Sequence, residues 1–66
     1  METFRVWENQ LTLIAENIET LDEAVSIAKL HHEAFPNRYH EVYRVLKNGQ
    51  SWGVCQWKPG DPVIRL

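Results

Sequence analysis

The chain has 66 residues, 44% of them hydrophobic and 11% aromatic, and its formal net charge is −2 at pH 7. This length suits one small domain over residues 1–66, in which each buried aromatic side chain contributes a large area. A single cysteine, Cys55, excludes an internal disulfide framework. The chain contains neither an apolar run long enough to span a membrane nor a secretion signal, so we expect a cytoplasmic protein.

The charged side chains are unevenly distributed along the chain. Residues 1–33 carry seven acidic and two basic side chains, whereas residues 34–66 carry two acidic and five basic ones. No Lys or Arg lies between Arg5 and Lys29. Four acidic residues in this interval form what we call the acidic patch: Glu16, Glu19, Asp22 and Glu23. Such a cluster is typical of a solvated helix start, and it also suits a protein partner with a basic surface.

The first 18 residues predict a β-hairpin. Apolar and polar side chains alternate over Thr3–Glu8, which is typical of a half-buried strand. Asn9-Gln10 can form a tight turn because Asn tolerates positive φ, and Leu11–Ile18 then forms the second strand. A two-residue turn pairs Val6 with Leu13 across the hairpin.

A helix is predicted over Leu21–Ala34. Thr20 and Glu23 form a capping box at its start, and Pro36 cannot continue it. At 100° per residue, one face of this helix is apolar and has alanines at its centre, which allow a sheet to approach closely. The residues of this face are Leu21, Ala24, Val25, Ala28 and Phe35.

The second half of the chain predicts another hairpin. Its strands are Tyr39–Lys47 and Gln50–Trp57, and Asn48-Gly49 between them is a strong signal for a two-residue turn. Lys58–Pro62 breaks the last strand, so residues 58–66 form a tail in which Val63–Leu66 either adds a short edge strand or stays mobile. The register that follows from the turn pairs Tyr43–Val54, Val45–Trp52, Val42–Cys55, Leu46–Ser51, Arg44–Gly53 and His40–Trp57.

We therefore predict an α+β fold with the order β-β-α-β-β, in which two hairpins form an antiparallel sheet and one helix packs on one face. On the helix side we expect Phe4, Val6, Leu13, Tyr43, Val45, Trp52 and Val54. On the bare side we expect Arg5, Trp7, Thr12, Ile14, His40, Val42, Arg44, Leu46, Cys55 and Trp57. A bare face this apolar implies a cover, which is a partner, a second copy of the chain or the C-terminal tail.

The sequence has no catalytic, metal or cofactor signature. His31 and His32 point about 100° apart on a helix, so they do not ligate one ion easily, and their spacing with His40 and Cys55 matches no closed zinc site. We expect both helix histidines to line the edges of the buried stripe with their polar tips in water. Cys55 is more typical of a small packed residue than of a nucleophile. A non-enzymatic protein without cofactors follows.

Arginine and tryptophan recur on the expected bare face. We expect an exposed sheet face made by Arg5, Trp7, Arg44 and Trp57. Aromatic rings with arginine can stack nucleic-acid bases, although an acidic chain is poorly suited to phosphate. The same composition is typical of protein-interface hot spots.

The segment from Ile18 to Ala24 resembles the strand-to-helix entry of HicB-type antitoxins. In its size, its sheet with one helix and its acidic helix start, the whole chain is similar to anti-CRISPR proteins of phages and mobile elements, particularly inhibitors of type I complexes. This resemblance implies a protein of the bacterial host cytoplasm that binds a Cas subunit of a type I effector and blocks its nucleic-acid-binding surface.

Three functions remain open at this stage. The first is a protein-binding inhibitor that uses the acidic patch. The second is a small nucleic-acid-binding module that uses the arginine and tryptophan side chains of the sheet. The third is a structural homodimer that closes two bare faces together, whereas the first two allow a monomer.

Overall fold

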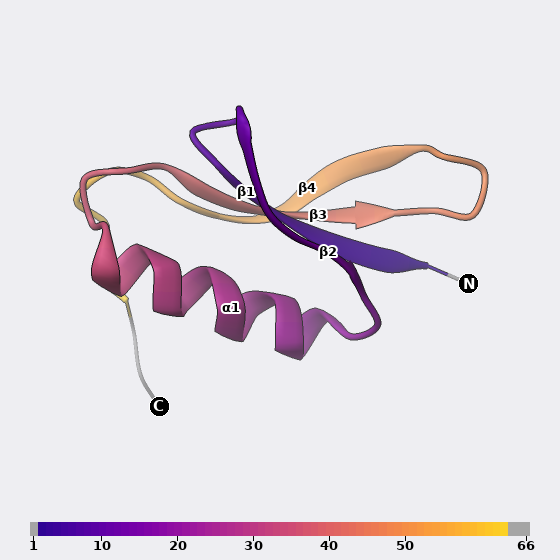
Figure 1. Cartoon of the computed structure of the whole chain (residues 1–66), viewed down its shortest axis with the longest axis horizontal. Helices are drawn as coiled ribbons and strands as arrows, with labels where there is room; N and C mark the ends of the chain where they lie inside the picture. Colours follow the sequence, from indigo (N-terminus) through magenta and orange to yellow (C-terminus); the bar gives the residue numbers. More distant parts are fainter. Residues whose placement is uncertain (1, 64–66) are drawn as a thin grey trace.

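The computed structural model describes residues 2–63. Its elements are β1 (Thr3–Glu8), β2 (Thr12–Ile18), α1 (Leu21–Ala34), β3 (His40–Val45) and β4 (Ser51–Trp57). The strands form one antiparallel sheet in the order β2-β1-β3-β4, and α1 lies along one face of it (Figure 1). The predicted α+β fold is confirmed. Val63 is not in a strand, and the rest of the predicted edge strand lies outside the described residues.

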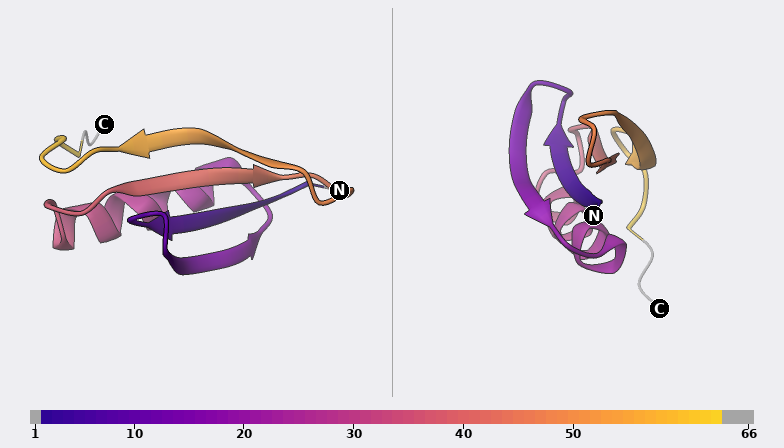
Figure 2. Two further views of the ribbon diagram at one scale, coloured as in Figure 1. Left: turned by 90° about the horizontal axis from the view of Figure 1, so that it is seen from above. Right: turned by 90° about the vertical axis from the view of Figure 1, so that its right-hand side faces the viewer.

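The helix begins and ends where the sequence predicts. The Thr20 hydroxyl oxygen accepts a hydrogen bond from the Glu23 backbone N–H at 3.2 Å, which satisfies one of the free donors of the first turn. At the other end, the Phe35 N–H donates to the His31 carbonyl oxygen at 2.9 Å, and Pro36 follows. Seen from above, the helix crosses beneath the central strands (Figure 2), and it contacts β1, β3 and β2.

The β1–β2 hairpin has a different register from the predicted one. Asn9 and Gln10 both have positive φ, 52° and 59°, as a tight turn requires, but strand pairing resumes only at Glu8 and Thr12. Two further irregularities in β2 shift the register again, and Asn17 has a φ of 57°. Val6 therefore pairs with Ala15, and the predicted pairing of Val6 with Leu13 is wrong.

In the β3–β4 hairpin, the loop is one residue longer than predicted, and a bulge further along the strand restores the predicted register. The Leu46 N–H donates to the Gln50 carbonyl oxygen at 2.7 Å, so the loop has three residues and Gly49 closes it with a φ of 90°. This moves the pairs near the turn by one residue, as in Tyr43–Gly53, Arg44–Trp52 and Val45–Ser51. Val54 is left unpaired as a bulge, and the predicted pairs Val42–Cys55 and His40–Trp57 are correct.

The two faces of β3 are the reverse of the prediction, as are those of β4 at Cys55 and Trp57, whereas Trp52 lies on the helix side as predicted. Residues opposite each other on antiparallel strands share a face, and Val42 of β3 lies opposite Val6 of β1. Val42 is fully buried on the helix side. The residues that the register places there with it, against prediction, are His40, Arg44, Cys55 and Trp57. The open face instead carries Leu13, Tyr43 and Val45, which were expected against the helix.

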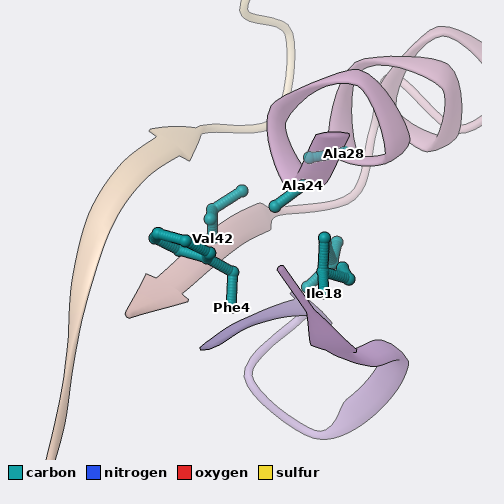
Figure 3. Close-up of a cluster of buried hydrophobic side chains, with 6 residues drawn as sticks. Phe4, Ile18, Ala24, Ala28 and Val42 are labelled. Carbon is teal, nitrogen blue, oxygen red and sulfur yellow. The ribbon is translucent and has the colours of Figure 1, made fainter. Parts of the chain in front are cut away.

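The core is small and lies between the helix and the two central strands. Its buried apolar residues are Phe4, Val6, Ile18, Ala24, Ala28 and Val42 (Figure 3). Two of the six are alanines on α1, so the helix backbone approaches the sheet closely. The helix that these described residues include is not long and apolar enough to cross a membrane.

Filling this close contact is expected to destabilise the fold. Ala28→Leu adds three carbon atoms at a position with no exposed surface, and we expect it to lower the free energy of unfolding by about 1–3 kcal/mol. Ser26→Leu, on the exposed side of the same helix, is the matched control and should change it by less than about 0.5 kcal/mol. Urea unfolding followed by circular dichroism measures both variants, and equal stabilities would contradict the packing described.

Candidate functional site

Three polar side chains are buried on the helix side of the sheet. Glu8 lies on β1, His40 opposite it on β3, and His32 on α1; both histidines have no exposed surface, and Glu8 is 7% exposed. The two histidine Nδ1 atoms are 2.8 Å apart, and His40 Nε2 lies 3.1 Å from Glu8 Oε2. At the ends, His32 Nε2 is 2.9 Å from the Asp61 carbonyl oxygen, and Arg38 donates to Glu8 Oε1 at 3.1 Å. We call this set the histidine network.

Local sequence explains why these groups meet. Alternation along β1 puts Glu8 on the same face as Phe4 and Val6. On the helix, His32 follows Ala24 and Ala28 at spacings of four, so all three point to the sheet. Asp61 is brought back by a turn in which the Gly60 N–H donates to the Pro36 carbonyl oxygen at 2.8 Å.

The hydrogen bonds of the network fix how many protons the two rings can hold. The Asp61 carbonyl oxygen only accepts, so His32 Nε2 carries a proton and donates it. The contact between the two Nδ1 atoms holds one proton, and the His40–Glu8 contact holds one more. A fourth ring proton would place two N–H groups against each other at 2.8 Å. The folded pair therefore holds at most three ring protons, against four in two free imidazolium rings.

Burial opposes positive charge on His40. It lowers the pKa of His40 below the usual 6.5, while the hydrogen bond that His40 donates to Glu8 acts in the opposite direction. His31 is half-buried with its ring centre 6.4 Å from that of His40, and its charge also lowers the pKa of His40. None of the main hollows on the described surface is lined by a ring of the pair. The network is thus a structural element that responds to pH.

The side chains considered for metal binding or catalysis have other surroundings. The sequence predicted that the polar tip of His32 reaches water, and this prediction is wrong because the side chain is fully buried. Cys55 is half-buried and packs beside the core, opposite Val42. Within residues 2–63, no group of three or more His, Cys, Asp or Glu side chains is placed to hold a metal ion.

The four residues of the acidic patch are all exposed. Glu16 lies on β2, Glu19 precedes the helix cap, and Asp22 and Glu23 are in the first turn of α1. They share the corner at which β2 leads into the helix. The ion pairs found among the described residues join Arg38 and His40 to Glu8, and Arg44 to Glu2, so none of them involves the patch.

The exposed sheet face predicted from the sequence is not one surface. Arg5 and Trp7 lie on the open face, since they are opposite Tyr43 and Glu41. Arg44 lies on the helix side, where its guanidinium is 5.6 Å from the Phe4 ring centre and 3.3 Å from Glu2. Trp57, also on that side, is half-buried against the core. The prediction failed because the face that packs against the helix was assigned for each hairpin without reference to the other hairpin.

The open face carries residues that the sequence analysis did not select. Tyr39, Glu41 and Tyr43 follow one another at every second position along β3 and its entry, beside Trp7 on β1. A hollow of about 230 Å³ adjoins them, lined by Arg5, Trp7, Gln10, Tyr43 and Ser51. In Figure 1 the β1–β2 hairpin rises away from the helix, on this same side. The alternation of Tyr, Glu and Tyr is the signal that could have identified this face.

Comparison of the chain with models of protein families, with curated proteins and with solved structures finds no match in any of the three.

The proton count of the histidine network predicts loss of stability in acid. Well below pH 6.5 the two histidines of the unfolded chain approach four ring protons, about one more than the folded pair can hold. The folded state disfavours that proton, so the protein is more stable at neutral pH and loses stability as the pH falls below 6.5. We expect the free energy of unfolding to drop by about 0.7–2 kcal/mol between pH 6.5 and pH 5.5, measured by urea unfolding.

His31→Gln is the control for this prediction, because it removes a neighbouring histidine and leaves every hydrogen bond of the network in place. The control should keep the pH dependence. Nitrogen-15 spectra of the imidazole rings should also show His32 protonated at Nε2 at neutral pH. Equal stability at pH 6.5 and pH 5.5 would contradict the proton count.

Proposed function

We propose that this chain is a non-enzymatic, phage-encoded inhibitor that acts in the cytoplasm of a bacterial host. It binds a basic, nucleic-acid-binding surface on a protein of a host defence complex. The observation that carries the proposal is the exposed acidic patch, whose carboxylates make no ion pair among the described residues. The resemblance to inhibitors of type I CRISPR complexes supports the proposal of a Cas subunit as the partner.

The mechanism follows from the chemistry of the patch. Four carboxylates within eight residues present negative charge at a helix start, with no Lys or Arg between Arg5 and Lys29 to compensate it. A groove that binds nucleic acid is lined by Lys and Arg for phosphate. Carboxylates that occupy such a groove replace phosphate contacts and prevent nucleic acid from binding. Charge complementarity of this kind also speeds association with the partner.

The proposal of a non-enzymatic role is supported by the residues that carry reactive side chains. Glu8, His32 and His40 are committed to buried hydrogen bonds, and Cys55 packs beside the core. A catalytic group needs access to a substrate. Glu8, His32 and His40 have little or no exposed surface, and Cys55 lies on the helix side of the sheet.

The alternative functions have less support than the sequence suggested. Nucleic-acid binding relied on two arginines and two tryptophans sharing a face, but Arg44 and Trp57 lie on the other side from Arg5 and Trp7. The homodimer relied on an apolar bare face, but that face carries Arg5, Glu41 and Tyr43. The acidic patch does not depend on these assignments.

Neutralising the patch should abolish capture of the partner. The immobilised chain and its Glu19→Gln, Asp22→Asn variant are used as baits in a lysate of a bacterium that carries a type I defence system. We expect the parent to retain a nucleic-acid-binding subunit, identified by mass spectrometry, and the variant to retain at least tenfold less. Nucleic acid added in excess should release the subunit from the parent.

The control for net charge is Leu30→Lys with Asn37→Lys, which changes the net charge by the same +2 but at exposed positions outside the patch. It should capture the subunit like the parent. Circular dichroism confirms that both variants are folded. Undiminished capture by the neutralised variant would rule out the acidic patch as the binding surface.

A further inference from the structure

Glu41 shares the open face of the sheet with three aromatic residues, and its carboxylate lies over Gly53 on β4. Glu41 is directly opposite Trp7 on β1, while Tyr39 and Tyr43 precede and follow it at alternate positions on the β3 side. Neighbours at these positions lie within reach of one another's side chains. We call these four residues the open-face site.

The Glu41 carboxylate has an unused acceptor. Its Oε1 atom is buried and accepts no hydrogen bond from the residues that the structure describes. The nearby Tyr39 hydroxyl donates to Gln56 Oε1 at 2.8 Å. A buried carboxylate oxygen without a donor is costly, so this atom needs an explanation.

Gly53 on β4 leaves the space that the Glu41 carboxylate occupies. A Cβ atom added at Gly53 would collide with Glu41 Oε2, so the carboxylate lies directly over the glycine backbone. A hollow of about 300 Å³ is found here, lined by Glu41, Gly53 and the adjoining residues of β4. This volume is at the lower end of the range for ligand pockets.

The charges around the site leave Glu41 without a cation. On the open face the nearest basic residue is Arg5, opposite Tyr43, and in the described chain it forms no ion pair. Burial raises the pKa of Tyr39 to about 12 and also raises the pKa of Tyr43, and the Glu41 carboxylate acts in the same direction on both through hydrogen bonding and charge. The tyrosines therefore stay neutral, and Glu41 supplies the negative charge of the site.

We infer that the open-face site binds an arginine side chain of the protein partner. A guanidinium stacks on aromatic faces and pairs with a carboxylate through its charge, so it matches both kinds of group present. This inference rests on the proposed function, because it takes the cation from a partner with a basic surface. It adds a short-range contact to the longer-range attraction of the acidic patch.

The test uses two small probes, acetyl-arginine amide and acetyl-citrulline amide, which have similar shapes but differ in charge. Each is titrated into the labelled protein and followed by proton–nitrogen correlation spectra. We expect the arginine probe to shift the Trp7 indole N–H and the Tyr43 amide in a saturable way. The citrulline probe should bind at least tenfold more weakly. Trp52 and Trp57 lie on the other face and serve as internal references.

Variants assign the binding to Glu41. Glu41→Gln keeps the shape and removes the charge, and Gly53→Ala keeps the charge and displaces the carboxylate; each should weaken arginine binding at least tenfold. The patch variant with Glu19→Gln and Asp22→Asn should bind the probe like the parent. Equal shifts from both probes, or undiminished binding by Glu41→Gln, would overturn the inference. Loss of partner capture only in the patch variant would leave the proposed function standing without this site.

Discussion

The buried hydrogen bonds from Glu8 through His40 and His32 to the Asp61 carbonyl connect every layer of this small molecule. They join β1 to β3, β3 to α1, and α1 to the turn that follows β4. A buried polar group that loses its partner costs about 1–3 kcal/mol. A domain of this size has a total stability of only about 3–10 kcal/mol, so each bond of this network is a large share of it.

The same network determines which side of β3 faces the helix. Because Glu8 and His40 are paired inside, Val42 two residues later is also inside, where it completes the core with Val6. Alternation along the strand then places Glu41 and Tyr43 outside. The binding face thus follows from the way in which the polar core is satisfied, even though no residue of that face belongs to the core.

Features that depend on residues close together in the sequence could be predicted, whereas features that depend on contacts between distant residues could not. The helix and all four strands follow from local signals such as the Thr20 cap and Pro36, and the acidic patch follows from proximity along the chain. The registers were less accessible, because β-bulges such as the one at Val54 leave no clear mark. The faces of β3 were assigned wrongly because the more apolar set of residues was placed against the helix, whereas that side holds the buried His40. Glu8, in phase with Phe4 and Val6, was the available sign that the core needed a polar partner.

The two acidic features differ in the stage of binding to which they contribute. Exposed carboxylates of the patch act over about 8 Å at physiological salt, so they mainly affect how fast a basic partner arrives. The half-buried Glu41 acts only on contact, where exclusion of water strengthens its attraction for a cation and lengthens the lifetime of the complex. In the free chain the unpartnered Oε1 atom of Glu41 lowers the stability of the fold, and Gly53 leaves the space that allows the carboxylate to lie there. If the proposed site binds an arginine side chain, the bound state removes this cost.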